Sequence, residues 1–130
     1  MWPFRRRQRS EPTGTLRMGE HSADADDYDV FAVSESRHPE VFARLWEQAS
    51  TTERDQGRVK RWAVLVPIRD PKFGVADLAV QFDGDTACFL RPPHLGRVAK
   101  QIDAARVATL EAPALVEWGP AGPSVRLRIP

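Results

Sequence analysis

The sequence is poor in cysteine, with Cys88 as its one thiol in 130 residues. A single cysteine cannot form an internal disulfide, and it cannot make a cysteine-based zinc site by itself. Such a composition is typical of a reducing compartment, so we expect the protein in the cytoplasm. Cys88 falls inside an alternating apolar pattern, which predicts a small buried side chain rather than a reactive thiol.

Long apolar runs and a charge excess of one sign are also missing. No stretch approaches the roughly 20 apolar residues of a membrane helix, and the net charge is only +1. The basic start is followed by no apolar run, so we expect no secretory signal. Binding to an anionic partner would therefore need a local basic patch.

Groupings of catalytic residues are scarce as well. Ser34, Ser36 and His38 lie close together in the sequence, but no Gly-x-Ser-x-Gly motif frames either serine. The histidines show no metal-ligand spacing among themselves or with the cysteine: His21, His38 and His94. Gly119 and Gly122 are flanked by prolines, which cannot supply the backbone donors of a phosphate loop. We therefore expect neither an enzyme nor a metal or other cofactor.

What is present begins with a charged segment, residues 1–27. Its first part is basic and its second part acidic, with too little apolar surface to offset the entropy of ordering a chain. We expect a disordered tail. The basic start has two interpretations: an arm that meets nucleic acid or an anionic membrane, or a solvated tail.

From residue 28 the pattern becomes that of a folded domain, 28–130. Apolar alternation predicts strands at 28–34 and 59–68, with a helix from Pro39 between them and a polar loop at 51–57. Asp83-Gly84 predicts a hairpin between strands 78–82 and 86–90. A second helix at about 94–105 precedes two last strands, 107–118 (interrupted at Pro113) and 124–129. The order β-α-β-β-β-α-β-β predicts a mainly β fold with two helices, a small, partly closed barrel.

Aromatic and basic residues stand at the edges of the expected loops. Phe73 lies in a polar loop beside Lys72, outside the periodic core pattern, while Arg69 and Arg91 flank the hairpin and Trp118 ends a strand. Aromatic rings that stack bases and cations that meet phosphates are what single-stranded nucleic acid needs. The alternative is that Phe73 and Trp118 cap the ends of the barrel as part of its core.

Three segments resemble the HIRAN domain family. Residues 32–38 read A-V-S-E-S-R-H against a family pattern of the type V-V-G-E-S-x-Y. Residues 69–80 parallel a loop and strand of the type D-N-P-Y-D-x-N-A-V-A-V, and residues 83–90 parallel a strand ending G-Y-L. The following helix and residues 116–119 also fit the family's order.

The resemblance implies an OB-like barrel that holds single-stranded DNA, particularly its free 3′ end. On this basis Phe73 stands at the position of a base-stacking aromatic, Trp118 near a later one, and Phe89 within the G-Y-L block. Arg37 and His38 fall where the first block offers polar and aromatic contacts. The candidate nucleic-acid-binding set is then Arg37, His38, Arg69, Lys72, Phe73, Phe89, Arg91 and Trp118.

The sequence departs from the family pattern at the loop. Gly74 and Ala76 replace the Asp and Asn of the pattern, which removes an acidic group that would accept a bond from a terminal hydroxyl. We therefore carry two hypotheses: a HIRAN-like module for single-stranded DNA or DNA ends, and a diverged, non-catalytic protein-interaction domain that has lost DNA binding. The partner is DNA in the first case and a protein in the second.

Overall fold

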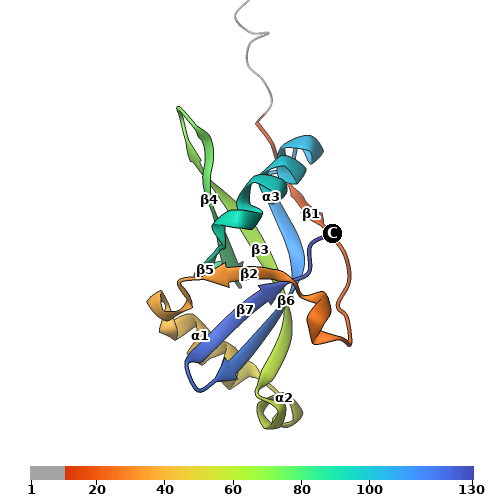
Figure 1. Ribbon diagram of the computed structural model, residues 1–130, viewed down its shortest axis with the longest axis vertical. Helices are drawn as coiled ribbons and strands as arrows, with labels where there is room; N and C mark the ends of the chain where they lie inside the picture. The colour runs from red at the N-terminus through yellow and green to blue at the C-terminus, as the bar shows by residue number, and fades with distance from the viewer. Residues whose placement is uncertain (1–10) are drawn as a thin grey trace, which may run out of the picture.

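The computed structural model describes residues 11–130, and the expectations for residues 1–10 lie outside that range. The described chain is mainly β with three α-helices (Figure 1). The strands are β1 Thr15–Arg17, β2 Val30–Val33, β3 Arg58–Asp70, β4 Gly74–Phe82, β5 Asp85–Leu90, β6 Thr109–Gly119 and β7 Gly122–Leu127. The helices are α1 Pro39–Gln48, α2 Thr51–Gln56 and α3 Pro92–Ala105, with short 3-10 turns η2 Ala25–Asp27 and η3 Glu35–Arg37.

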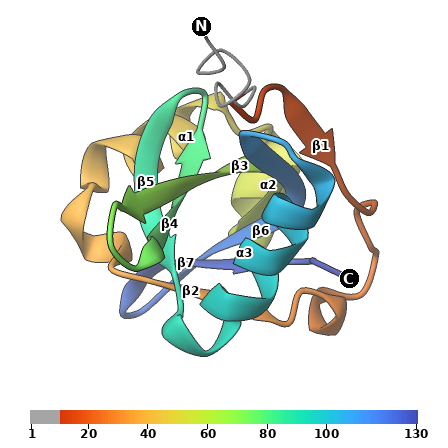
Figure 2. The same cartoon turned by 90° about the horizontal axis from the view of Figure 1, so that it is seen from above.

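Six of the strands close into an antiparallel barrel. The order is β6-β3-β4-β5-β2-β7, and pairing of β7 back to β6 completes the ring (Figure 2). The barrel is thus closed rather than partly closed, which removes the exposed sheet edges that an open sheet would leave. The predicted class, a small OB-like α+β barrel, is confirmed.

Alternating side chains fill the barrel. In β6 the even-numbered residues Leu110, Ala112, Ala114 and Val116 belong to one buried cluster with side chains from every other barrel strand. The odd-numbered residues lie on the other face of the strand, as the two-residue period requires, and of these Pro113 and Leu115 are buried as well, outside this cluster. Pro113 does not interrupt β6: it pairs with Trp62 of β3, and its carbonyl accepts a hydrogen bond from the Arg128 amide.

Helices cover the two ends of the barrel. Helix α1 buries Val41, Phe42 and Leu45, and it lies with α2 at the end of the barrel where β3 begins (Figure 1). Helix α3 buries Val98 and Ile102 at the opposite end. The barrel interior is therefore sealed by apolar faces that the helical spacing of these residues predicts.

The turn between β4 and β5 is as predicted. Asp83 and Gly84 both have positive φ, 52° and 85°, and Phe82 pairs with Asp85 across the turn. Two consecutive left-handed residues make the two-residue turn that matches the twist of the flanking strands.

The expected loop at 51–57 is wrong, because most of it forms α2. Ser50 accepts a hydrogen bond from the Glu53 amide, and the Glu53 carboxylate accepts one from the Ser50 amide. This reciprocal capping box satisfies two backbone donors at the start of the helix. Gly57, with a φ of 69°, ends it.

The expectation of a disordered tail over residues 1–27 is also wrong for residues 15–27, which with Tyr28 form what we call the N-terminal strap. Strand β1 pairs in parallel with the first part of β6, Leu16 opposite Leu110. The strap then crosses the outside of the barrel: the His21 ring meets Trp62 edge-on at 5.3 Å, and Lys60 donates to the Ser22 carbonyl. These contacts are with residues distant in the sequence, so the local composition of the strap does not reveal them.

Tyr28 anchors the far end of the strap. It is fully buried, and its hydroxyl hydrogen-bonds His21 Nδ1 at 2.8 Å and accepts from the Ser22 amide at 3.0 Å.

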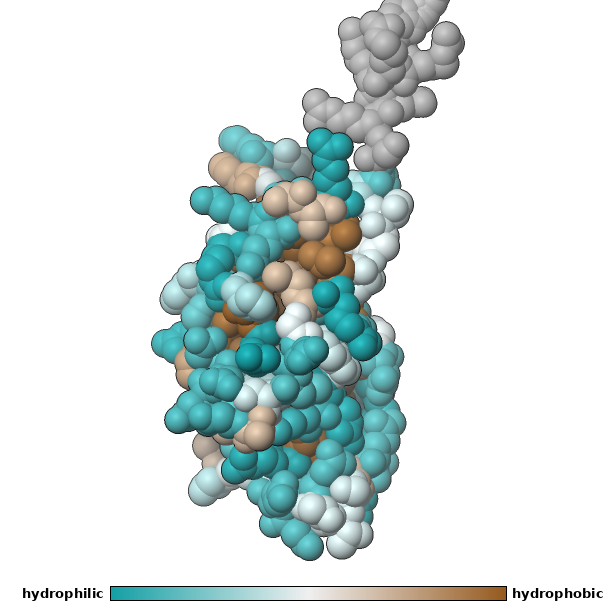
Figure 3. Space-filling view, turned by 90° about the vertical axis from the view of Figure 1, so that its right-hand side faces the viewer, coloured by the Kyte–Doolittle hydropathy of each residue, from teal (hydrophilic) through white to brown (hydrophobic). Residues whose placement is uncertain are grey.

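Seen from the side of β1, the surface is mostly hydrophilic, with hydrophobic side chains confined to small patches (Figure 3). No helix within residues 11–130 is long and apolar enough to cross a membrane.

Candidate functional site

The last residues of β3 and the first residues of β4 project beyond the barrel as a two-stranded ribbon, residues 66–78 (Figure 1). Pairing of β3 with β6 ends at Leu65, and pairing of β4 with β5 begins at Ala79. Among the described residues, the ribbon strands between these points pair only with each other. The ribbon is thus the part of the barrel sheet with two open edges.

The turn of the ribbon is held by one carboxylate. Asp70 Oδ1 accepts hydrogen bonds from the amides of Lys72 and Phe73, at 2.7 and 3.1 Å. Gly74 closes the turn with a φ of 83°, and a Cβ on it would meet no atom within 4 Å. The sequence Asp-Pro followed by Gly therefore builds a fixed turn, in which the Asp70 carboxylate is committed to the backbone.

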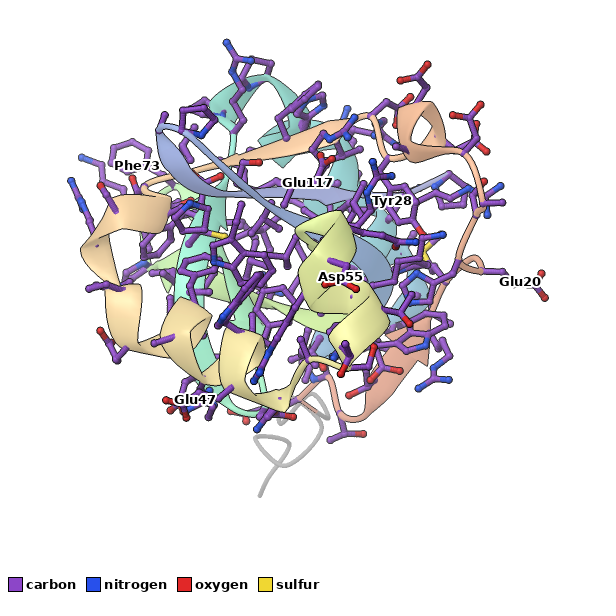
Figure 4. The ribbon with its side chains drawn as sticks, turned by 90° about the horizontal axis from the view of Figure 1, so that it is seen from below. Glu20, Tyr28, Glu47, Asp55, Phe73 and Glu117 are labelled. Atoms are coloured by element: carbon purple, nitrogen blue, oxygen red, sulfur yellow. The ribbon has the colours of Figure 1, made fainter. Side chains whose placement is uncertain are left out.

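The turn presents Phe73 to solvent. Its side chain is 76% exposed, the most exposed large hydrophobic group among the described residues. Figure 4 shows it at the periphery, far from the buried Tyr28. The Lys72 ammonium lies 5.4 Å from the centre of the Phe73 ring, within the range of a cation–π contact. An aromatic face with an attached cation can stack a base and meet its phosphate.

Charges around the turn are mixed. The Arg69 guanidinium pairs with Asp103 of α3 at 3.1 Å, and both side chains are about half exposed. Asp77 lies on the ribbon and accepts from the Leu78 amide. The ribbon carries two carboxylates, Asp70 and Asp77, and Asp103 lies beside it. These three carboxylates outnumber the two cations of the ribbon, Arg69 and Lys72.

A second group of candidates lies on the outer side of β2 and β5. Phe89 is half-buried opposite Val33. The Arg91 amide donates to the Phe31 carbonyl at 2.9 Å, and its exposed side chain makes no hydrogen bond or ion pair with the described residues. The rings of Phe31 and His94 lie 6.5 Å apart. Phe89 is opposite Ala79, at the base of the ribbon, so this group continues from the ribbon across the sheet.

The remaining candidates lie elsewhere. Trp118 lies near the start of β3, because its amide donates to the carbonyl of Gly57, the residue before β3. Phe73, in contrast, follows the end of β3. The 13 residues of β3 separate them, about 40 Å for a straight strand. Arg37 and His38 form the link from β2 into α1. The structure therefore brings together Arg69, Lys72 and Phe73, and leaves Trp118, Arg37 and His38 outside this group.

Trp118 has its own surroundings at the other end of the barrel. Its ring meets Trp46 of α1 edge-on, with ring centres 5.0 Å apart. With Phe42 and Ala43 they line a shallow apolar hollow. Arg54 of α2 lies over the Trp46 ring at 5.9 Å. The position of Trp118 is therefore explained by its packing against α1.

Sequence reasoning missed two exposed side chains. Ile68 of the ribbon is 44% exposed and Phe31 is 41% exposed. Phe31 stands between the buried Val30 and Ala32, which packs against the core, so alternation was the available signal there. Ile68 stands between the half-buried Pro67 and the exposed Arg69 on the ribbon, where alternation gives no such signal. The strand at 28–34 contained apolar residues on both faces, which concealed that Phe31 faces outward.

Within residues 11–130, three titratable groups have shifted pKa values, and they lie in separate places. A hydrogen bond from Arg61 lowers the pKa of Glu53 in α2 to about 2. Burial, followed by the charges of Lys60 and Arg61, lowers the pKa of His21 in the strap. Burial, with a smaller contribution from Glu35, raises the pKa of the Cys88 thiol inside the barrel. The prediction that Cys88 is buried is confirmed.

The fold and the ribbon define the class of protein: a small, closed OB-like α+β barrel with a projecting ribbon that ends in an exposed aromatic residue. No protein-family model matches the chain, and no curated protein or solved structure matches it either. Any assignment of function must therefore be argued from the residues themselves.

Proposed function

We propose that this chain is a HIRAN-like nucleic-acid-binding module that takes single-stranded DNA at the tip of the β3–β4 ribbon. The observation that carries the proposal is Phe73, which is 76% exposed on a fixed turn with the Lys72 ammonium 5.4 Å from its ring. A turn held by Asp70 orders the ring before binding, which lowers the entropy cost of stacking a base on it.

The energy available at this site is that of base stacking. Stacking of one base on an aromatic side chain contributes about 1–3 kcal/mol. Phe73 buries little surface in the barrel, so its ring is available for that contact. Lys72 adds a phosphate contact close to the stacked base.

Recognition of a strand terminus has less support than binding along a strand. A free 3′ hydroxyl needs an acceptor, and the side chains of Gly74 and Ala76 supply none. Oδ1 of Asp70 already accepts two backbone amides. We therefore propose contact with internal positions of the strand, without preference for an end.

The test is fluorescence anisotropy of a labelled single-stranded oligothymidine of about 15 nucleotides, titrated with the full chain at low salt. We expect Phe73→Ala to weaken binding about tenfold, which corresponds to about 1.4 kcal/mol. Phe73→Trp should retain binding. Blocking the 3′ end of the oligonucleotide with a phosphate should leave the affinity unchanged.

Ile68→Ala is the matched control, because it removes another exposed apolar side chain from the same ribbon without removing an aromatic ring. It should weaken binding much less than Phe73→Ala does. Absence of binding at low salt, or equal losses in the two variants, would refute the proposal.

The alternative function is a protein-interaction domain without DNA contact. The apolar hollow beside Trp46 and Trp118 favours it, because both rings are only half-buried there. This alternative expects a protein that co-purifies with the chain and no effect of Phe73→Ala in any DNA assay.

A further inference from the structure

Strand β2 presents a second exposed aromatic side chain, Phe31, which is 41% exposed. Of its neighbours, Val30 belongs to the core and Ala32 packs against it. Alternation therefore turns the Phe31 ring to the outside of the barrel. The His94 ring of α3 lies 6.5 Å from the Phe31 ring and is tilted by 34°. Together the two rings form an aromatic surface separate from Phe73.

A cation stands beside this aromatic surface. Arg91 links β5 to α3, and its amide donates to the Phe31 carbonyl at 2.9 Å. The Arg91 side chain is exposed and has no hydrogen-bond or ion-pair partner within residues 11–130. Arg69 of the ribbon, in contrast, is paired with Asp103. An exposed ring with a cation beside it is the combination that single-stranded nucleic acid binds.

The sheet connects Phe31 to the ribbon on one face. Phe89 of β5 pairs with Ala79 of β4, and β5 pairs on its other side with β2. The two sequence neighbours of Phe89, Cys88 and Leu90, lie in the core, so Phe89 faces outward as Phe31 does. The outer face of the sheet therefore runs from the base of the ribbon over Phe89 to Phe31.

The separation of Phe31 from Phe73 matches a short single strand. Strand β2 lies two strands away from β4, about 10 Å at the usual spacing. Continuing the pairing of Phe89 with Ala79 sets position 91, beside Phe31, across from position 77, and Phe73 lies about 13 Å further along β4. In a flat sheet the two rings are then about 16 Å apart. A stacked strand advances about 3.4 Å per nucleotide, so about five nucleotides join them.

We propose that Phe31 is a second stacking position for the same single strand, with one base on the Phe31–His94 surface and a phosphate on Arg91. The strand then crosses the outer face of β5 and β4 to Phe73. This inference rests on the proposed function and specifies its ligand, an unpaired strand of at least about five nucleotides. Such a length lies within the range of about 4–16 nucleotides that OB folds cover.

Phe31→Leu is the first test, because leucine keeps much of the packing volume and removes the aromatic ring. We expect F31L to weaken binding of labelled oligothymidine by the full chain about tenfold, and F31W to retain binding. R91Q should reduce the slope of log K against log salt by about 0.7. R54Q is its matched control, since it removes an exposed arginine of α2 at the other end of the barrel; it should leave the slope nearly unchanged.

Strand length tests whether one strand covers both rings. Unlabelled oligothymidines of two and of eight nucleotides compete with the labelled strand. The longer competitor should be at least about tenfold more effective with the unaltered chain, because only it reaches both Phe73 and Phe31. F31L should reduce that ratio at least about threefold, since a single ring remains to be stacked.

Asp77 tests the path between the rings. It lies two residues before Ala79 in β4, so alternation places it on the same outer face, where its charge repels a passing phosphate. D77N removes that charge, and the asparagine oxygen can still accept the Leu78 amide. We expect D77N to raise the affinity about two- to threefold at low salt. D83N is the control for net charge, because Asp83 is exposed at the opposite end of β4; it should change the affinity much less.

The outcomes separate this inference from the function on which it rests. Loss of binding in F73A with unchanged affinity in F31L and R91Q overturns the second position and leaves the proposed function standing. Loss in F31L with no change in F73A, or no binding by the unaltered chain, overturns both. If F31L keeps the length dependence of the unaltered chain, or if D77N and D83N have equal effects, the continuous path between the rings is overturned.

Discussion

Side chains of the strap contact residues that lie far away in the sequence. His21 contacts Tyr28 through a hydrogen bond and Trp62 through its ring. The Arg17 guanidinium lies over the same Trp62 ring at 4.1 Å. A proton on His21 would add a charge to a half-buried ring that already lies near Lys60 and Arg61. The folded chain therefore resists protonation of His21.

This resistance predicts a pH dependence of stability. The pKa of His21 is lower in the folded chain than in the unfolded chain, so the unfolded state binds the proton first as the pH falls. Stability is then fully present above the usual histidine pKa of about 6.5 and decreases below it. Urea unfolding at pH values between about 8 and 5 should show a smaller loss in His21→Gln than in the unaltered chain. Equal losses would contradict the assignment.

The exposure of Phe73 could be predicted, because local sequence determines the geometry of its turn. Asp70-Pro71 and Gly74 build the turn, so the exposure of Phe73 follows from a short segment outside the apolar alternation. The place of Trp118 depends instead on α1, which packs against it from 72 residues earlier in the chain. No local pattern shows that contact, and for the same reason the sequence did not separate Trp118 from Phe73.

At the scale of elements, α2 shows how a short polar helix is held. It has six residues and buries none of them, so tertiary burial does not account for it. Its ends are fixed by the Ser50–Glu53 capping box and by Gly57, and Arg61 of β3 pairs with Glu53 at 2.8 Å. Capping and one ion pair therefore replace the apolar face that stabilises most short helices.

Removing the cap should destabilise the protein by a predictable amount. Ser50→Ala leaves the Glu53 amide without its acceptor and should cost about 1 kcal/mol of unfolding free energy. Thr52→Ala is the matched control, because Thr52 is exposed in the same helix and makes no capping bond. It should change stability by less than about 0.5 kcal/mol. Urea denaturation of the two variants checks this, and equal effects would show that the capping box contributes nothing.

The same helix predicts a loss of stability in acid at a lower pH range than that of His21. The Arg61 hydrogen bond lowers the pKa of Glu53 to about 2 from 4.5. Its stabilising effect is therefore present above pH 4.5 and is lost as the pH falls toward 2. Glu53→Gln should be less stable than the unaltered chain at neutral pH, and the difference should shrink in acid. A difference that stays constant with pH would contradict this cause.

Strands and turns could be predicted from the sequence where the period of two is unbroken. The strand around Val64 and the turn at Asp83-Gly84 are examples. Alternating β-branched residues favour a strand, and an Asp-Gly pair favours a two-residue hairpin turn. Helix α2 was missed because it lacks apolar periodicity, although its Ser-x-x-Glu spacing was visible. Strand β1 has three residues, too few for any period, and forms only because β6 offers an edge.

At the scale of the whole molecule, the strap runs along the outside of the barrel from β6 to Tyr28. It pairs with the first half of β6, covers Trp62, and ends at the buried Tyr28. The C-terminal segment meets it from the other side, since the Arg128 guanidinium donates to the Glu20 carbonyl at 2.6 Å. A domain boundary at residue 28 would cut through this packing, because β1 and the rest of the strap pack against the barrel.

Truncation therefore provides a test at this scale. A chain lacking residues 1–27 loses the packing of Leu16 and Met18 against the barrel core and all the hydrogen bonds of the strap. Full burial of such a side chain contributes about 1.5–3 kcal/mol. Both side chains are partly buried, so we expect a loss of at least about 2 kcal/mol, or a fall in Tm of roughly 8 °C or more.

A chain lacking only residues 1–10 is the reference for this truncation, because it keeps every contact described above. Differential scanning calorimetry of the two truncated chains separates packing by the strap from any effect of residues 1–10. The longer truncation should also bind a hydrophobic dye more strongly, since Trp62 loses its cover. Equal midpoints in the two chains would mean that the strap rests on the barrel without stabilising it.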